Sequence, residues 1–284
     1  MSAATTPSSS PEYPEALRDL TPPPDALWSL GDLETLNARV VVAIVGTRRA
    51  TSYGLRVTRE LSTALARAGA CVVSGMARGI DGAAHRGALD ASGRTVAVLG
   101  TPVDVIYPRA HRAMYQEIVR RGLVLSDMPP GTPPRRWHFA ERNRIIAALA
   151  RVVFVVEAPH KSGALRTVDF ADRLNRTIAA IPGPIDSPQS AGSNELLRDG
   201  AQFIASIDDA LTLAGLPPSP RGAIDVENEV ERRIWDALGA GGASLDELCA
   251  RSGLPVAECM SAVTGLELRG VIECALTGEI RRRI

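Results

Sequence analysis

The stretch ACVVSGMARGIDGAAHRGALDASG, residues 70–93, decides the predicted fold. It opens with an apolar run, Ala70–Val73, which has the length and β-branching of a buried strand. Small residues follow at Ser74, Gly75, Gly79 and Gly82, and good helix formers come after them. A strand, a glycine-rich turn and a helix start form a nest of backbone N–H groups that favours an anion such as phosphate. The spacing is not the dinucleotide G-x-G-x-x-G, and close packing of helix on strand accounts for the glycines equally well.

Similar apolar runs alternate with helical patterns on both sides of this stretch. The pattern predicts strands at residues 40–45, 70–73, 95–99, 122–125, 152–156 and 177–181. It predicts helices near residues 53–68, 80–91, 109–120, 141–150 and 164–174. Short β-branched strands that alternate with helices are typical of a parallel sheet covered on both faces. We therefore expect an α/β fold with a doubly wound, mainly parallel, Rossmann-like sheet.

Composition predicts five segments in the chain of 284 residues. Residues 1–11 are rich in Ser, Thr and Pro, which predicts a disordered tail, and residues 12–39 form an N-terminal extension. The Rossmann-like domain is expected at 40–214, and a proline-rich linker at 215–225. Residues 226–284 read as three helices and a hairpin, with a capping box at Ser244 and Glu247. This order predicts a small C-terminal winged-helix domain.

Charge is distributed unevenly, although the formal net charge is zero. Residues 40–214 carry 22 basic and 15 acidic side chains, whereas both flanks are acidic. Every basic residue is Arg except Lys161. Arg offers a planar fork for phosphate and a face for stacking on bases. The charge excess indicates an anionic partner for the central domain.

Several features bear on cellular location. No apolar run reaches the length of about 20 residues that a membrane span needs, and the N-terminal residues do not resemble a secretory signal. The four cysteines form no C-x-x-C pair. We expect a reduced, cytoplasmic protein without membrane insertion.

Residues that follow the predicted strands are candidates for a binding site, because ligands of such sheets lie outside the carboxyl ends of the strands. Small residues recur there together with Arg or Lys, which predicts a concave basic rim. The segments are Gly46-Thr47-Arg48, the glycine nest, Tyr107-Pro108-Arg109 and Lys161-Ser162-Gly163.

A cluster of Arg and aromatic residues, RRWHFAERNR at 135–144, adds a second signal. Arg pairs with phosphate, and an exposed aromatic ring can stack on an unpaired base for roughly 1–3 kcal/mol. The alternative is a solvated helix start with Trp137 and Phe139 turned into the core. In a chain with 4% aromatic residues, two rings inside an Arg cluster favour nucleic acid.

Catalytic chemistry is less well supported by the sequence. Asp81 and His85 are four residues apart on one predicted helix and could form an acid–base pair, but an Asp there more often caps the helix. Asp104, Asp127 and Glu157 show no spacing that specifies a metal. We assign no catalytic residue, metal or cofactor from the sequence.

Taken in order, several motifs resemble the DNA-processing protein A family. They are VAIVGTRRATSYG, VVSGMARGIDGAAHRGAL, Tyr107-Pro108, FAERNRIIAALA, VVEAPHKSGAL and IPGPI…GSNELLRDGA. The resemblance covers about residues 20–213, and the winged helix fits the optional C-terminal domain of the family. It implies an extended Rossmann fold that binds single-stranded DNA, forms a homodimer and loads the RecA recombinase onto DNA in natural transformation.

The resemblance also assigns site residues. It places the Arg of the family's first loop at Arg48, the basic residue after Tyr-Pro at Arg109, and a basic and a base-contacting position at Arg136 and Phe139. The remaining implied DNA contacts are Gly46, Thr47, Ser74, Gly75, Gly79, Arg142, Asn143, Arg144, Lys161, Ser162 and Gly163. The chain departs from the family pattern at Ala164, at Arg166 and at Asp127-Met128.

Two other functions fit parts of the sequence. A nucleotide phosphoribohydrolase of related fold would bind a nucleoside monophosphate in the same nest, but its PGGxGTxxE motif is missing from this chain. A duplex-DNA regulator would bind DNA through the winged helix and sense a small molecule through the Rossmann-like domain. The third predicted helix of the winged helix is poor in Arg and Lys, which argues against this function.

Overall fold

The computed structural model describes residues 3–218, 228–239, 242–269, 271–275 and 278–282. The chain divides into two compact units, Met1–Ser219 and Pro220–Ile284, which are described separately below. Within the described residues, no helix combines the length and the apolar character needed to cross a membrane.

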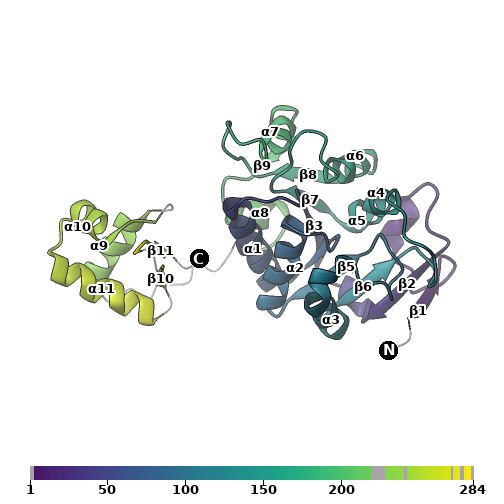
Figure 1. Cartoon of the computed structure of the whole chain (residues 1–284), viewed down its shortest axis with the longest axis horizontal. Coiled ribbons are helices and arrows are strands. Elements are labelled where there is room, and N and C mark those ends of the chain that lie inside the picture. The colour runs from purple at the N-terminus through teal and green to yellow at the C-terminus, as the bar shows by residue number, and fades with distance from the viewer. Residues whose placement is uncertain (1–2, 219–227, 240–241, 270, 276–277, 283–284) are drawn as a thin grey trace. The chain divides into compact units, whose positions relative to one another are not determined.

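The first unit is built on a sheet whose strand order is β1-β2-β6-β5-β4-β3-β7-β8-β9 (Figure 1). The strands from β6 to β9 run parallel, and β2 and β1 add to the β6 edge in antiparallel fashion. The strands are β1 Ala4–Pro7, β2 Ala26–Gly31, β3 Val40–Val45, β4 Ala70–Ser74, β5 Arg94–Val98, β6 Leu123–Ser126, β7 Val152–Val155, β8 Thr177–Ala180 and β9 Gln202–Phe203. The predicted mainly parallel, doubly wound sheet is confirmed.

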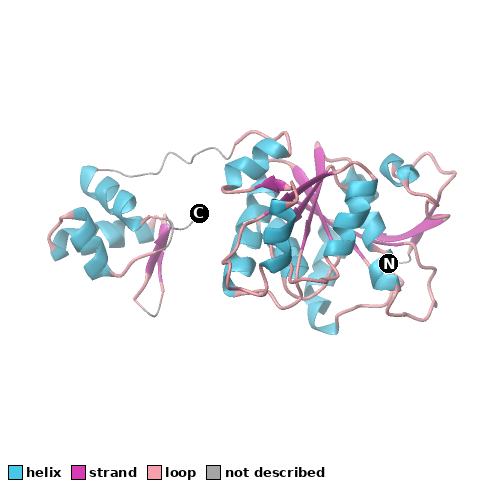
Figure 2. Ribbon diagram, turned by 90° about the horizontal axis from the view of Figure 1, so that it is seen from above, coloured by secondary structure: helices cyan, strands magenta, loops and turns pink. Residues whose placement is uncertain are grey.

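Helices cover both faces of this sheet (Figure 2). They are α1 Ser52–Arg67, α2 Ile80–Asp90, α3 Arg112–Arg121, α4 His138–Glu141, α5 Asn143–Leu149, α6 Leu165–Arg173, α7 Ala191–Arg198 and α8 Ile207–Leu213. The 3-10 helices are η1 Glu15–Asp19, η2 Leu33–Leu36 and η3 Arg109–His111. The helix predicted near 109–120 is thus a 3-10 turn followed by α3.

Strand β3 shows how the sequence selects the two faces. Val42 and Ile44 belong to one core, which also holds apolar residues of α1, α2 and α8. Ala43 and Val45 belong to the other core, which holds those of η1, α5 and α6. Successive side chains of a strand point to opposite faces, so an unbroken apolar run fits a strand that is buried on both sides.

The N-terminal segment differs from the prediction. Residues 1–11 were expected to be disordered, but Ala4–Pro7 is a strand paired with β2, with Ala4 opposite Ser29. The hydrogen bonds between these two strands join backbone groups, so a composition rich in Ser, Thr and Pro does not predict them. Arg18 also donates to the carbonyl oxygens of Ser8 and Ser10. The predicted tail therefore supplies strand β1, and the N-terminal extension supplies strand β2.

The order of the strands creates a switch point beside β3. From β3 the chain adds β4, β5 and β6 on one side, and then returns to place β7, β8 and β9 on the other. The loops after β3 and β7 diverge there, which leaves a crevice at the carboxyl ends of the strands. The segment Gly46-Thr47-Arg48 begins at this crevice.

The second unit has a small core of its own. Its helices are α9 Glu229–Leu238, α10 Leu245–Ser252 and α11 Val256–Leu268, followed by the hairpin of β10 Ile272–Cys274 and β11 Ile280–Arg282. This order is that of the predicted winged helix, and the predicted capping box of Ser244 and Glu247 is present. Residues 219–225 of the predicted linker lie outside the described residues.

Candidate nucleic-acid interface

The loop after β3 is held between the end of β7 and the start of α2. The N–H of Thr47 donates to the carbonyl oxygen of Glu157 at 2.7 Å, and its own carbonyl accepts from Ile80 at 3.2 Å. A Cβ on Gly46 would lie 2.5 Å from the Ile80 side chain. Thr47 is buried, whereas the next residue, Arg48, is exposed. The loop therefore fixes its backbone inside and presents a guanidinium group to solvent.

The glycine nest after β4 is filled by a side chain of the same chain. The Asp81 carboxylate accepts from the N–H groups of Gly75 and Ala77, at 3.2 and 3.4 Å. The Ser74 hydroxyl is buried and donates to the carbonyl oxygen of Ile44. These contacts correct the expectation that Ser74 and Gly75 offer donors to phosphate. Gly79, with φ of 75°, lets the chain pass close to the Thr47 carbonyl.

Arg142 lies beneath the same nest and is 4% exposed. Its guanidinium donates to the carbonyl oxygen of Gly75 at 2.7 Å and to that of Val98. Burial lowers the pKa of Arg142 to about 10, while the charge of Asp81 opposes this shift. Burial also raises the pKa of Asp81, and the charge of Arg142 acts against that change. The two side chains compensate each other's charge inside the fold.

The other residues of the Arg142-Asn143-Arg144 run also have partners within the chain. Asn143 donates to the carbonyl oxygen of Gly163 at 3.1 Å, which fixes the segment Lys161-Ser162-Gly163. Arg144 pairs with Asp127 at 2.8 Å and donates to the carbonyl oxygen of Pro22. Sequence reasoning gave this run direct DNA contacts. In the structure these side chains have internal partners instead. The start of the helix packs against the ends of strands, and buried carbonyl groups at those ends need hydrogen-bond donors, which the side chains of the run supply.

Exposed guanidinium groups surround the crevice. They belong to Arg48, Arg49, Arg78, Arg109, Arg136 and Arg166. Within the described part of the chain, none of these six forms an ion pair with a carboxylate. Cations without internal partners keep their charge available for an anionic ligand. Arg49, Arg78 and Arg166 were not predicted as site residues, although Arg49 and Arg78 adjoin predicted ones in the sequence.

Phe139 occupies the middle of the crevice. Its ring packs against Gly100, where a Cβ would lie 2.8 Å from the ring, and its centroid is 4.9 Å from that of Tyr107. Two cavities, of about 720 and 540 Å³, both include Phe139 in their walls. Arg136, Ser162 and Gly163 line the larger cavity, and Arg109 lines the smaller one. Cavities of this size accommodate organic ligands.

The Asp81 and His85 pair is enclosed. His85 has no exposed surface, and burial lowers its pKa to about 3. Its Nδ1 lies 2.8 Å from the hydroxyl of Thr95, which itself donates to the carbonyl oxygen of Val72. A hydroxyl that already donates must accept from His85, so Nδ1 carries the proton. In the described residues, no group of three or more His, Cys, Asp and Glu side chains is placed to hold a metal ion.

The chain matches two family models of known proteins. A family model described as DNA recombination-mediator protein A matches residues 4–215, and one described as DprA winged helix domain matches residues 217–275. A DprA-type DNA processing protein of Mycobacterium tuberculosis is 44% identical over 261 residues, covering 88% of this chain and 67% of that protein.

Solved structures of two related proteins also resemble this chain. The X-ray structure of DNA processing protein A from Streptococcus pneumoniae has a TM-score of 0.71 at 38% identity, over 74% of each chain. DNA processing protein A from Helicobacter pylori, whose structure is described in terms of its single-stranded DNA binding mode, has a TM-score of 0.68 at 34% identity. That match covers 74% of this chain and 94% of the other.

Proposed function

The chain belongs to the DNA recombination-mediator protein A family, as its motifs predict, and on this premise we propose that it binds single-stranded DNA at the crevice of the first unit. The observation that carries the proposal is the group of six exposed Arg side chains near Phe139, none of which forms an ion pair with any residue that the structure describes. Guanidinium groups neutralise phosphates, and an aromatic ring contacts unpaired bases whatever their sequence. The related H. pylori protein is described as binding single-stranded DNA.

The residues contribute to binding in two ways. Arg48, Arg109 and Arg136 neutralise phosphates, and Phe139 stacks on or wedges between bases. The glycine nest and Arg142 shape the backbone that presents these groups, and they make no direct contact with the strand.

The biological role that we propose follows the family. The protein acts as a homodimer in the cytoplasm, and it loads RecA recombinase onto incoming single strands during natural transformation. It acts as a mediator without catalytic activity of its own. A stimulation of RecA filament assembly on single-stranded DNA, measured with and without the protein, tests this role directly.

The phosphoribohydrolase alternative receives little support from the crevice. Such an enzyme needs the nest for the phosphate of a nucleotide and an accessible carboxylate for hydrolysis. Asp81 occupies the nest donors, and Glu157, which is 1% exposed, accepts from the N–H of Thr51 at 2.9 Å. Release of free base from AMP would revive this alternative.

Fluorescence anisotropy tests the DNA-binding proposal. Labelled single-stranded and duplex oligonucleotides of equal length are titrated over a range of salt concentrations. We expect preference for the single strand and a binding constant that falls with salt. The double variant R48A/R109A loses two phosphate contacts, so its slope of log K against log salt becomes less negative by about 1.4.

Arg67→Ala is the matched control for these Arg variants. Arg67 is exposed in the last turn of α1, just before the amino end of β4 and therefore opposite the crevice. Its removal changes the net charge without removing a crevice contact. Equal behaviour of R67A and R48A/R109A contradicts the proposed site, and equal affinity for duplex and single strand contradicts the proposed specificity.

A further inference from the structure

The two cavities of the crevice meet at Phe139, Arg48 and Arg49, and each has a second aromatic side chain in its wall. Tyr107 lines the smaller cavity and Trp137 the larger one. The two cavities therefore adjoin each other, and three aromatic residues line them, with Phe139 in the wall of both.

Tyr107 and Trp137 are exposed to an unusual degree. Tyr107 is 49% exposed and Trp137 is 57% exposed. Among the described residues, Phe203 is the only other Phe, Trp or Tyr that is as exposed as these two. Large aromatic rings dominate the energetics of binding surfaces because they bury much apolar area, so exposed rings in the walls of two adjoining cavities mark a contact site.

Both rings are held in position from one side. The Tyr107 ring is inclined at 55° to Phe139, which rests on Gly100. The Trp137 ring packs edge-on to His138, with centroids 4.0 Å apart. His138 is itself fixed, since its Nδ1 accepts from the N–H of Arg135 at 3.1 Å. Each ring thus has a supported side and an exposed side.

Cations accompany each ring. Arg78 and Arg109 line the cavity of Tyr107, and Arg136 and Arg166 line that of Trp137. An aromatic ring beside guanidinium groups is the arrangement that binds an unpaired nucleotide, because the ring stacks on the base while the cation neutralises its phosphate. The same arrangement is present on both sides of Phe139.

We propose that Tyr107 and Trp137 are base-stacking residues, so that an unpaired strand crosses Phe139 and places one base against each of these rings. This inference rests on the proposed function and extends it. Stacking on a ring requires no particular base, so the two contacts discriminate against paired bases and tolerate any sequence.

Tryptophan fluorescence tests one half of this path. The chain has three Trp residues, Trp28, Trp137 and Trp235. When oligothymidylate is added to the full chain, a base stacked on Trp137 quenches its emission. We expect quenching in the wild type and in Trp235→Phe, a variant altered only in the second unit, and the loss of most of this quenching in Trp137→Phe.

Affinity measurements test both halves. Trp137→Ala and Tyr107→Leu each weaken binding of oligothymidylate by about 5- to 150-fold. Their salt slopes remain those of the wild type, because neither variant removes a phosphate contact. Trp137→Phe and Tyr107→Phe keep a ring and retain affinity. Met260→Ala removes an exposed apolar side chain of the second unit and serves as the unaffected control.

Crosslinking provides a measurement that does not depend on any variant folding. Oligonucleotides that carry 5-iodouracil are irradiated with the wild-type protein, and the attached peptides are identified by mass spectrometry. We expect adducts at Tyr107 and at Trp137.

The outcomes separate this inference from the proposed function. Suppose that the wild type binds single strands and that R48A/R109A weakens this binding. If Trp137→Ala and Tyr107→Leu then bind as the wild type does, and no crosslink forms at Tyr107 or Trp137, the stacking inference is overturned while the proposed function stands. A role for only one ring overturns the path across Phe139. If the wild type does not bind single strands, the proposed function fails and the inference fails with it.

Discussion

Asp81 and Arg142 are buried together against the backbone of Gly75. A Cβ on Gly75 would lie 2.5 Å from the Arg142 guanidinium and 2.7 Å from the Asp81 carboxylate, which explains the glycine. The nest that could have bound an external anion thus holds an internal one. The chain uses the donors of the glycine turn to hold the Asp81 carboxylate, and not to hold an external anion.

We predict that Arg142→Met lowers the free energy of unfolding by about 3–5 kcal/mol, because it leaves a buried carboxylate without its cation. The carbonyl groups of Gly75 and Val98 also lose their donor. Denaturant unfolding measures the change. Arg109→Met, at an exposed position, should alter stability by no more than about 0.5 kcal/mol. Equal losses in the two variants contradict the internal role of Arg142.

His85 gives the stability a pH dependence of known sign. Its pKa is about 3 in the folded chain, against an ordinary value of 6.5. Between these values the unfolded chain binds the proton and the folded chain does not. The free energy of unfolding therefore falls as pH is lowered from 6.5 towards 3.

Replacing His85 with Gln removes this one proton from the difference between the folded and unfolded chains. We predict that the dependence of stability on pH becomes shallower in His85→Gln, by up to about 1.4 kcal/mol per pH unit, because one proton is no longer taken up on unfolding. Guanidinium unfolding at several pH values between 4 and 6.5, roughly the window of the shift, measures both slopes. Parallel curves for the two proteins show that His85 titrates normally in the folded state.

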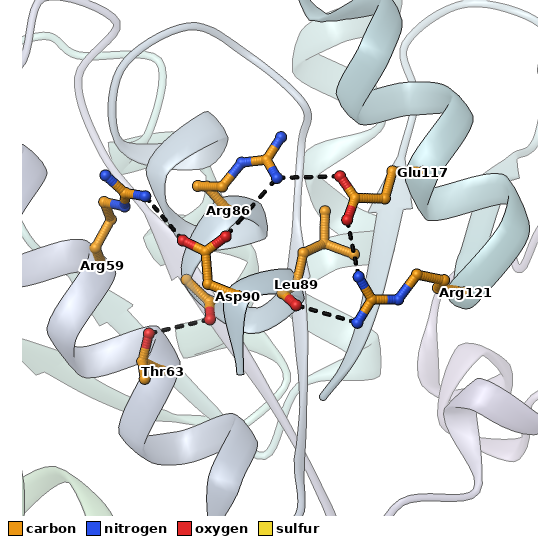
Figure 3. Close-up of polar contacts among 8 residues, drawn as sticks. Arg59, Thr63, Arg86, Leu89, Asp90, Glu117 and Arg121 are labelled. Atoms are coloured by element: carbon orange, nitrogen blue, oxygen red, sulfur yellow. Dashed lines mark hydrogen bonds and ion pairs between the residues drawn. The ribbon is translucent and has the colours of Figure 1, made fainter. Parts of the chain in front are cut away.

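At the scale of elements, α1, α2 and α3 are joined by a network of charged side chains (Figure 3). Arg59 of α1 pairs with Asp90 of α2 at 2.8 Å. Glu117 of α3 accepts from Arg86 of α2 at 3.0 Å and from Arg121 of its own helix at 2.8 Å. Glu117 thereby connects α3 to α2, the helix that begins directly after the glycine turn.

We predict that Glu117→Gln lowers the free energy of unfolding by about 1 kcal/mol, because two partly exposed ion pairs are lost together. The loss decreases at high salt, where such pairs are screened. Thermal unfolding at low and high salt measures both effects. The control is Glu60→Gln, which breaks one pair within α1 and should cost about 0.3–0.5 kcal/mol. A loss in Glu117→Gln no larger than that of the control contradicts a connecting role.

The elements that the sequence predicts best are those buried on both faces. Residues 40–45 form β3 as expected, because an unbroken β-branched run fits little else in a parallel sheet. Strands β1, β2 and β9 were missed. Strand β1 lies in a Ser, Thr and Pro-rich stretch, β2 lies in the segment expected to be an extension, and β9 has two residues. An edge strand forms because its backbone pairs with that of a neighbouring strand, so its own amino-acid composition predicts it poorly.

The sequence predicts where the residues of the candidate site lie in the fold better than it predicts which way their side chains point. Arg48 and Arg109 follow strands, so the topology of a parallel sheet brings them to one edge. The inward direction of Arg142 depends on carbonyl groups of Gly75 and Val98 that come together only in the folded chain. Residue spacing in the sequence does not show that these two carbonyl groups need a hydrogen-bond donor. The Arg142-Asn143-Arg144 run was therefore interpreted as DNA-binding.

At the scale of the whole molecule, the two units have separate hydrophobic cores and different surface chemistry. All residues that line the crevice belong to the first unit. In the second unit, α11 occupies the place of a recognition helix, yet Val256–Leu268 contains two Glu and no Arg or Lys. Its large exposed apolar residues are Val256, Met260 and Leu268. Such a surface lacks the cations that binding to phosphates requires.

We predict that a chain ending at Ser219 binds single-stranded DNA with an affinity within about twofold of the full chain and with the same salt slope, since every residue that lines the two cavities belongs to the first unit. We also predict that residues 220–284 alone do not bind duplex DNA at physiological salt. Anisotropy titrations of the two fragments, each checked for cooperative unfolding, measure both. Duplex binding by the second fragment would mean that groups outside α11 provide the contact, and a large loss of affinity in the first would mean that the crevice alone does not hold the strand.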